Sequence, residues 1–260
     1  MKLKNEFGKN PRHWLALLSL AAACASVLLA RLTEGAERHR VPSSAASLSA
    51  EEIIKKVDDI RNPSESFRMK IEVNSADADS VSRFDVMIRG NTKTLVKTLE
   101  PARDRGRNLL MLGEEMWAYI PNLKRALRVS LSQKLTGQAA NGDISRMRWS
   151  GDYSGEIEKK DAKEWTILLT AKKKGLTYEK VRVWVDQSTF RPRKSEFLTG
   201  AGKALKTATY TAYKEMAGRV RPTELLIQDA VREQDRSTLK ILSMEVREFP
   251  ESTFNQNSMN

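Results

Sequence analysis

Few side chains in this 260-residue sequence are of the types that most often carry out catalysis. The only histidines are His13 and His39, both close to the N-terminus, and Cys24 is the only cysteine. The rest of the chain therefore cannot supply a histidine-based triad, a histidine zinc site or a thiolate nucleophile. No glycine-rich loop of the kind that binds phosphates is present either. We therefore expect neither a metal nor a cofactor.

Carboxylates are the remaining candidates for acid–base chemistry. Asp85, Asp143, Asp152 and Asp186 could form a catalytic pair, as in a hydrolase of envelope glycans. No spacing in the sequence brings any two of them together, so we interpret each as a turn or surface residue. We do not expect an enzyme, and a carboxylate-based glycan hydrolase stays the catalytic alternative.

A second set of residues could bind rather than react. Aromatic side chains and methionines are distributed along the strand-rich part of the chain, where most such residues form a core. They could also line an apolar cavity suited to acyl chains, because methionine adapts to irregular contents. Our candidates for such a cavity are Ile53, Ile54, Val57, Ile60, Phe84, Met111, Trp117, Tyr119, Trp165, Trp184 and Phe197.

One amphipathic helix is predicted over residues 50–61. Ser49 is placed to cap its N-terminus, and Glu52 completes a capping box. Four apolar residues of this helix, Ile53, Ile54, Val57 and Ile60, share one face at helical spacing. The helix therefore has an apolar surface to place on another element.

Most of the remaining chain alternates between apolar and polar residues, the pattern of half-buried strands. Residues 109–129 predict a hairpin, with turns at 113–115 and at Pro121-Asn122. We count about ten strands with short connections, which predicts a mainly β protein with a large curved antiparallel sheet. Residues 131–155 break the pattern and predict one or two short helices with loops.

The N-terminus has the order of a secretory signal. Basic residues precede an uncharged run over 14–30, so we predict that residues 1–36 are a signal peptide or an N-terminal membrane anchor. The segment 20–24 also resembles a lipoprotein signal, which makes lipidation at Cys24 an alternative. The prediction continues with a linker over 37–47, a domain over 48–254 and a flexible tail over 255–260, and places that domain in the periplasm.

The chain is basic, with a formal net charge of +12. Residues 1–36 contain five basic and two acidic residues, a net of +3, so +9 belongs to the rest. A basic surface suits phosphates, including anionic lipid headgroups, although it can also serve solubility alone. Export disfavours nucleic acid as the partner.

Several segments resemble one family in order along residues 48–246. They are Thr98-Leu99-Glu100-Pro101 with Arg105-Gly106, Met116-Trp117-Ala118-Tyr119-Ile120-Pro121, Arg182-Val183-Trp184-Val185-Asp186 and Gly218-Arg219-Val220-Arg221-Pro222-Thr223. Together they resemble the outer-membrane lipoprotein-sorting protein family, relatives of the periplasmic lipoprotein carrier LolA. The resemblance implies a half-open β-barrel covered by helices, with the helix 50–61 as one cover and residues 131–155 as the other.

The resemblance also implies a function. A member of this family would bind acyl chains of lipoproteins or lipids in its apolar cavity and move them towards the outer membrane. An inner-membrane transporter and an outer-membrane acceptor are then the candidate partners. The alternative from a different class is an envelope adaptor that associates with a membrane transporter and carries nothing.

Overall fold

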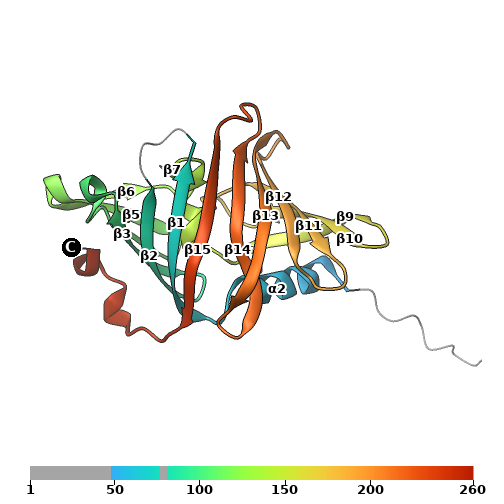
Figure 1. Cartoon of the computed structure of the whole chain (residues 1–260), viewed down its shortest axis with the longest axis horizontal. Helices are drawn as coiled ribbons and strands as arrows, with labels where there is room; N and C mark the ends of the chain where they lie inside the picture. The colour runs from blue at the N-terminus through green and yellow to red at the C-terminus, as the bar shows by residue number, and fades with distance from the viewer. Residues whose placement is uncertain (1–47, 77–80, 260) are drawn as a thin grey trace, which may run out of the picture. The chain divides into compact units, whose positions relative to one another are not determined.

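The computed structural model describes residues 48–76 and 81–259, which are dominated by one antiparallel sheet of thirteen strands (Figure 1). The first half of the chain supplies β1 (Ser66–Ser75), β2 (Ser82–Arg89), β3 (Lys93–Glu100), β4 (Leu109–Leu112), β5 (Glu115–Ile120) and β6 (Arg125–Val129). The second half supplies β9 (Tyr153–Lys160), β10 (Glu164–Ala171), β11 (Lys180–Asp186), β12 (Pro192–Leu198), β13 (Ala204–Met216), β14 (Arg219–Asp229) and β15 (Arg236–Val246).

The order of strands in the sheet is simple. Consecutive strands pair with each other, except that β1 and β15 meet in the middle of the sheet. The order runs β6-β5-β4-β3-β2-β1-β15-β14-β13-β12-β11-β10-β9, so β6 and β9 are the two edge strands. The sheet is curved and not closed, which confirms the large curved antiparallel sheet that the sequence predicts and shows that the barrel is only half open.

Alternation along the strands separates the two faces of the sheet. In β11, Val181, Val183 and Val185 are fully buried, whereas the residues between them are half-buried. Pro192 is the first residue of β12, a position at which strands tolerate proline. The sequence does not predict β9, because Tyr153 and Ile157 are its only large apolar residues and the strand lies at an edge.

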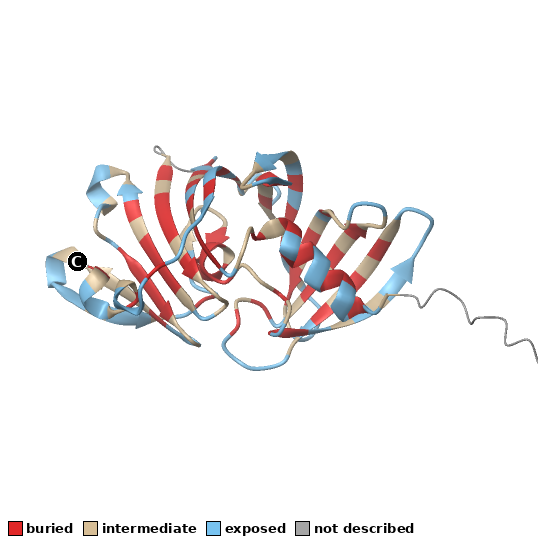
Figure 2. Ribbon diagram, turned by 90° about the horizontal axis from the view of Figure 1, so that it is seen from below, coloured by how far each residue is buried: buried red, intermediate tan, exposed pale blue. Residues whose placement is uncertain are grey.

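Helix α2 (Ala50–Arg61) has the bounds that the sequence predicts. The Ser49 hydroxyl accepts from the Glu52 N–H at 3.2 Å and the Glu52 carboxylate accepts from the Ser49 N–H at 2.8 Å, a complete capping box. The helix lies across strands of the second half of the sheet and contacts β9 and β14 (Figure 2). Ile53, Ile54 and Val57 face the sheet and are buried.

The connection between the edge strands crosses the sheet. β6 ends at one edge and β9 begins at the other, so residues 130–152 must pass over a face of the sheet to join them. We call this stretch the cover segment. It contains a short hairpin of β7 (Lys134–Thr136) and β8 (Ala139–Ala140), followed by the single turn of α3 (Asn141–Ser145). This agrees with the short helix and loops predicted for residues 131–155, and the hairpin is additional.

The main core lies between the concave face of the sheet, α2 and the cover segment. Leu131 and Ile144 of the cover segment are buried in it beside residues of β1, β2, β10 and β11. A smaller apolar group, which we call the outer cluster, lies on the opposite face of the first half of the sheet. It consists of Leu95, Leu110, Phe249, Phe254 and Met259, with Met87, Leu112, Trp117, Tyr119 and Ala126 packed against it.

The C-terminal residues differ from the prediction of a flexible tail. Two one-turn helices, η3 (Glu251–Thr253) and η4 (Gln256–Met259), place Phe254 and Met259 in the outer cluster. The Met259 side chain is fully buried and its carbonyl accepts from Asn108 Nδ2 at 2.8 Å. The sequence of residues 255–260 does not indicate this packing, because the segment is polar and only one methionine makes the contact.

The predicted signal or anchor over 1–36 and the linker over 37–47 lie outside the described residues. Residues 48–260 form one compact unit by themselves. Within residues 48–76 and 81–259, no helix is both long enough and apolar enough to span a membrane.

Candidate functional site

The concave face of the sheet is the candidate site, because spaces remain between it and its covers. One of them, which we call the large hollow, has a volume of about 290 Å³. Its floor is formed by residues of β2, β3, β4, β5 and β6, and its roof by residues 133–136 of the cover segment. Nine of the sixteen lining residues are polar or charged, and the apolar ones are concentrated on the floor. Floor residues Phe84, Leu109 and Ala118 belong to or pack on the main core. The volume approaches the lower end of small-ligand sites, roughly 300–1,000 Å³.

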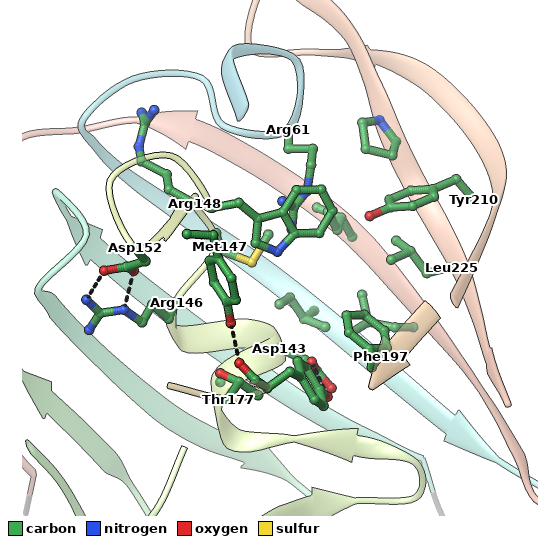
Figure 3. A pocket seen from close by; sticks show the side chains of 18 residues that line it. Arg61, Asp143, Arg146, Met147, Arg148, Asp152, Thr177, Phe197, Tyr210 and Leu225 are labelled. Atoms are coloured by element: carbon green, nitrogen blue, oxygen red, sulfur yellow. Dashed lines mark hydrogen bonds and ion pairs between the residues drawn. The ribbon is translucent and has the colours of Figure 1, made fainter. Parts of the chain in front are cut away.

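The second space, which we call the small cavity, lies under residues 142–153 (Figure 3). Its volume is about 60 Å³, too small for a lipid chain without movement of its walls. Phe197, Tyr210 and Leu225 of the sheet form one wall, and Met147 of the cover segment and Arg61 of α2 reach it from above.

A buried carboxylate joins the two covers. Asp58 of α2 is fully buried and accepts hydrogen bonds from the backbone N–H groups of Trp149 at 2.9 Å and Ser150 at 2.7 Å. Burial raises the pKa of Asp58 above its usual value, because desolvation disfavours the charge more than Arg61 and the two N–H groups favour it. Arg61 lies 3.4 Å from the carboxylate, and its guanidinium stacks over the Trp149 ring at 3.8 Å.

The C-terminal end of α2 is fixed to the sheet by an arginine. Arg221 of β14 is nearly fully buried and donates from Nη1 to the carbonyl oxygens of Asp59 and Ile60, each at 2.9 Å. A cation placed on the last carbonyls of a helix is favourable because these groups have no partner within the helix. Desolvation lowers the pKa of Arg221, yet the group stays charged near neutrality.

The cover segment is tied to the sheet through Asp143. This carboxylate accepts from Lys206 Nζ at 2.7 Å and from the Tyr178 hydroxyl at 2.8 Å. Lys206 also donates to the Gln138 carbonyl at 2.7 Å, so one β13 side chain binds two points of the cover. Burial raises the pKa of Tyr178 well above its usual value, which keeps the hydroxyl protonated as a donor.

A second anchor is a buried ion pair within the cover. Arg146 donates to both oxygens of Asp152 at 2.6 and 2.8 Å, and to the Gly113 carbonyl in the β4–β5 turn at 2.8 Å (Figure 3). Because a buried charge pair of this kind is costly to separate, it holds the C-terminal end of the cover segment to the β4–β5 turn. The cover segment is also closely packed at Gly142. A Cβ at this position would lie 1.8 Å from Thr177 Oγ1, so a larger residue would clash there.

Most of the predicted cavity residues lie on the concave side. Phe84 lines the large hollow and Phe197 lines the small cavity. Met111 and Trp165 are buried in the main core, where Trp165 stacks on Phe190 at 5.5 Å. Ile53, Ile54 and Val57 belong to the same core, whereas Ile60 lies at the rim of an open groove beside Phe190 and Val220.

Three predicted cavity residues lie on the other face of the sheet, which corrects our assignment. Trp117 and Tyr119 are half-buried against the outer cluster, because they alternate in β5 with Met116 and Ala118, which face the main core. Trp184 alternates with the fully buried valines of β11 and lies under the Lys194 ammonium at 5.1 Å. Aromatic character alone does not show which face a residue takes.

Apart from Asp143 and Asp152, which we considered for catalysis, the polar anchors were not among our sequence candidates, although two of them leave a signal. Asp58 lies four residues after Ile54, within the apolar stripe of α2, where a charge needs a buried partner. Lys206 is in phase with the buried Ala208 and Tyr210 along β13. Arg146 and Arg221 carry no such local pattern: Arg146 pairs with Asp152 through an irregular loop, and the helix carbonyls that accept from Arg221 are about 160 residues away.

The four carboxylates considered for catalysis all have structural contacts. Asp85 pairs with Arg68, Nε to Oδ1 at 2.7 Å, and Asp186 accepts from Ser188 and Thr189 in the turn after β11. Asp143 and Asp152 both line the small cavity, but each is paired with a cation there. These contacts give the carboxylates roles in holding the fold.

The class of protein is defined by an open, curved antiparallel sheet whose concave face is closed by one helix and a crossing segment, and the comparisons identify the family. A LolA superfamily protein from Nitrosomonas europaea is 35% identical, with 82% of this chain and 100% of that one covered and a TM-score of 0.76. The chain therefore belongs to the LolA superfamily.

Other comparisons support the fold alone. An outer-membrane lipoprotein-sorting protein domain from Vibrio parahaemolyticus is 21% identical over 81% of this chain and 97% of that one, with a TM-score of 0.64. A DUF1329 family protein from Desulfovibrio piger is 16% identical over 81% and 98%, with a TM-score of 0.68. A family model described as "Uncharacterized protein" matches residues 90–260. No curated protein matches the chain.

Proposed function

We propose that this protein carries acyl chains of lipoproteins or lipids in the apolar space on the concave face of its sheet. The observation that supports this most directly is the large hollow of about 290 Å³ between a floor that includes Phe84, Leu109 and Ala118 and a removable roof. The roof is removable in principle because the cover segment contributes no strand to the thirteen-stranded sheet and is held there by side-chain contacts. Displacing it would leave the sheet hydrogen bonds intact.

The energetics of such an exchange are balanced. No α2 residue lines the large hollow, so an acyl chain longer than the hollow would extend under α2 and displace Ile53, Ile54 and Val57. Each side chain of this size contributes about 1.5–3 kcal/mol on burial, and an acyl chain contributes about 0.8 kcal/mol for each methylene that it buries. A segment of roughly six to eleven methylenes would therefore replace the three side chains at little net cost. Loading and closure would be two states of similar free energy.

The covers would move as linked elements in this mechanism. Asp58 joins α2 to residues 149 and 150, so outward movement of α2 breaks these contacts unless the end of the cover segment follows. The Arg146–Asp152 pair holds that end to the β4–β5 turn. We therefore place the opening between α2 and the middle of the cover segment, with the ion pair as its fixed point.

We further propose that the carrier works in the periplasm and moves its cargo towards the outer membrane. The order of basic and apolar residues over 1–36 supports export. The Vibrio parahaemolyticus relative is described as an outer-membrane lipoprotein-sorting protein domain. A transporter that loads the carrier and an acceptor that unloads it would be its partners.

The test is the content of the purified protein. The full chain is purified from the cell envelope, extracted with organic solvent and analysed by mass spectrometry, and the emptied protein is titrated with a fluorescent fatty acid. We expect co-purifying acyl lipid and saturable binding by the emptied protein. If neither lipid nor fatty-acid binding is found, the carrier is excluded and the adaptor without cargo is favoured.

A further inference from the structure

One end of the sheet carries an exposed basic surface beside the large hollow. The loop after β3 contains the one-turn helix η1 (Ala102–Asp104), and the turn between β5 and β6 contains η2 (Pro121–Leu123). The two loops touch, since a Cβ at Gly106 would lie 3.3 Å from Pro121 Cγ. Figure 1 shows both one-turn helices at the same end of the sheet, in green. We call residues 101–107 and 121–125 the basic tip.

The basic tip has a strong charge imbalance. It contains Arg103, Arg105, Arg107, Lys124 and Arg125 against a single acid, Asp104, a net of +4. Asp104 pairs with Arg107 at 3.1 Å and with Arg103 at 3.6 Å. Within residues 48–76 and 81–259, Lys124 and Arg125 have no ion-pair partner. Both side chains are exposed.

An exposed leucine lies among these cations. The Leu123 side chain stands at the turn directly before Lys124 and is 53% exposed. An apolar residue surrounded by arginine and lysine suits the surface of an anionic bilayer, where the apolar group enters the headgroup region and the cations contact phosphates. Arginine guanidinium groups are well shaped for phosphate oxygens.

Three other exposed turns lack this combination of unpaired positive charge and an exposed apolar residue. The β14–β15 turn exposes Val231, but residues 229–236 contain two basic and three acidic residues, a net of −1. The β9–β10 hairpin over 156–164 contains three lysines and four acids, also a net of −1. In the basic turn 172–174, Lys173 is paired with Glu114 at 2.6 Å.

The position of the tip links it to the cavity. Pro101, Asp104 and Arg107 of the tip line the large hollow, and so does Ile120, the residue before the second loop. A bilayer in contact with the tip would therefore lie at the rim of the hollow. We propose that the basic tip docks the protein on membranes rich in anionic lipids, at the mouth through which an acyl chain enters or leaves. The entry role rests on the proposed carrier function, whereas the docking does not.

The docking is tested with vesicles and the full chain. Vesicles of phosphatidylcholine, with or without phosphatidylglycerol, are floated with wild type, with Lys124→Glu/Arg125→Glu and with Leu123→Ser. The control, Lys159→Glu/Lys160→Glu, makes the same charge change on the hairpin next to the opposite edge of the sheet. Each basic residue at an anionic surface is worth about fivefold in affinity, so the tip double variant should bind anionic vesicles at least about twentyfold more weakly. The control should bind them like wild type.

A local probe shows where contact occurs, whatever residues 1–36 add to binding. In a Cys24→Ser background, an environment-sensitive fluorophore is attached to Leu123→Cys or, as the control position, to Lys160→Cys. We expect a blue shift at position 123 with anionic vesicles, a smaller one at higher salt, and none at position 160. Equal shifts at both positions, or none at position 123, overturn the docking. An acidic protein surface would then be the better partner for the tip.

The carrier function is measured separately. Fluorescent fatty-acid binding without vesicles should be unchanged in Lys124→Glu/Arg125→Glu, because these two side chains do not line the large hollow. Fatty-acid binding without a position-123 shift would overturn the docking and leave the carrier standing. A position-123 shift in a protein that binds no fatty acid would support the docking and overturn the carrier.

Discussion

The carboxylate of Asp58 on α2 accepts the backbone N–H of Trp149 on the cover segment at 2.9 Å. The two residues are 91 positions apart in the sequence, and the Asp58 side chain is fully buried. It is the point at which the two covers of the concave face meet. The stability and the opening of these covers should therefore depend on this one side chain.

Removing the carboxylate should loosen the covers. Asp58→Ala leaves two buried N–H groups without an acceptor, and each such group costs about 1–3 kcal/mol. We expect a lower free energy of unfolding in urea and faster uptake of a fluorescent fatty acid. The matched control is Asp59→Ala, whose half-exposed side chain lies 3.9 Å from Arg148 and should change stability by less than about 1 kcal/mol. Equal stability of the two variants would contradict the role given to Asp58.

The same residue predicts a dependence of stability on pH. Burial raises the pKa of Asp58 from 3.8, so the folded chain retains this proton to higher pH than the unfolded chain. Ionisation therefore lowers the free energy of unfolding as pH rises from 3.8 towards neutrality. Asp58→Asn keeps an acceptor oxygen and cannot ionise. The stability of wild type relative to Asp58→Asn should fall across that range in urea unfolding, and a constant difference would speak against the raised pKa.

Filling the large hollow should block binding. Ala118 lines this space on β5, so Ala118→Trp places an indole where an acyl chain would lie. We expect fluorescent fatty-acid affinity to fall by about tenfold or more, equivalent to about 1.4 kcal/mol. Tyr119→Trp is the matched control, because the neighbouring residue packs on the outer cluster instead. If both variants bind like wild type, the acyl chain does not use the large hollow.

The C-terminal turn should contribute to stability. Met259 is fully buried in the outer cluster, and Met→Ala in a core costs about 2–5 kcal/mol. We expect Met259→Ala to lower the free energy of unfolding towards the lower end of that range, because the cluster is small. Asn257→Ala, at an exposed position of the same turn, should have no comparable effect. A flexible tail, as the composition suggests, would make the two variants equal in urea unfolding.

The sequence by itself determined α2 and most of the strands of this protein, because their signals are local. The capping box of Ser49 and Glu52 fixed where α2 begins, and alternation over residues such as Val181, Val183 and Val185 fixed the strands. Two further features narrowed the classes of function that we expected. Residues 48–260 contain no histidine or cysteine, and the family motifs occur in order along the chain. The helix and strand signals depend on residues within one turn of helix or one strand, and the other two are read directly from the linear sequence.

Only the tertiary structure decided which residues share the site. Trp117 and Ala118 are neighbours in the sequence, yet one packs on the outer cluster and the other lines the large hollow, because successive residues of a strand face opposite sides of the sheet. The sequence shows that alternation. When both alternating sets of residues in a strand are apolar, however, it does not show which set faces the concave side. The partners of Asp58 and Met259 were likewise set by strand order, since β1 and β15 meet in the middle and residues 130–152 must cross between the edges. Contacts of such long sequence separation leave no local pattern, so the covers and their anchors became visible only in the folded chain.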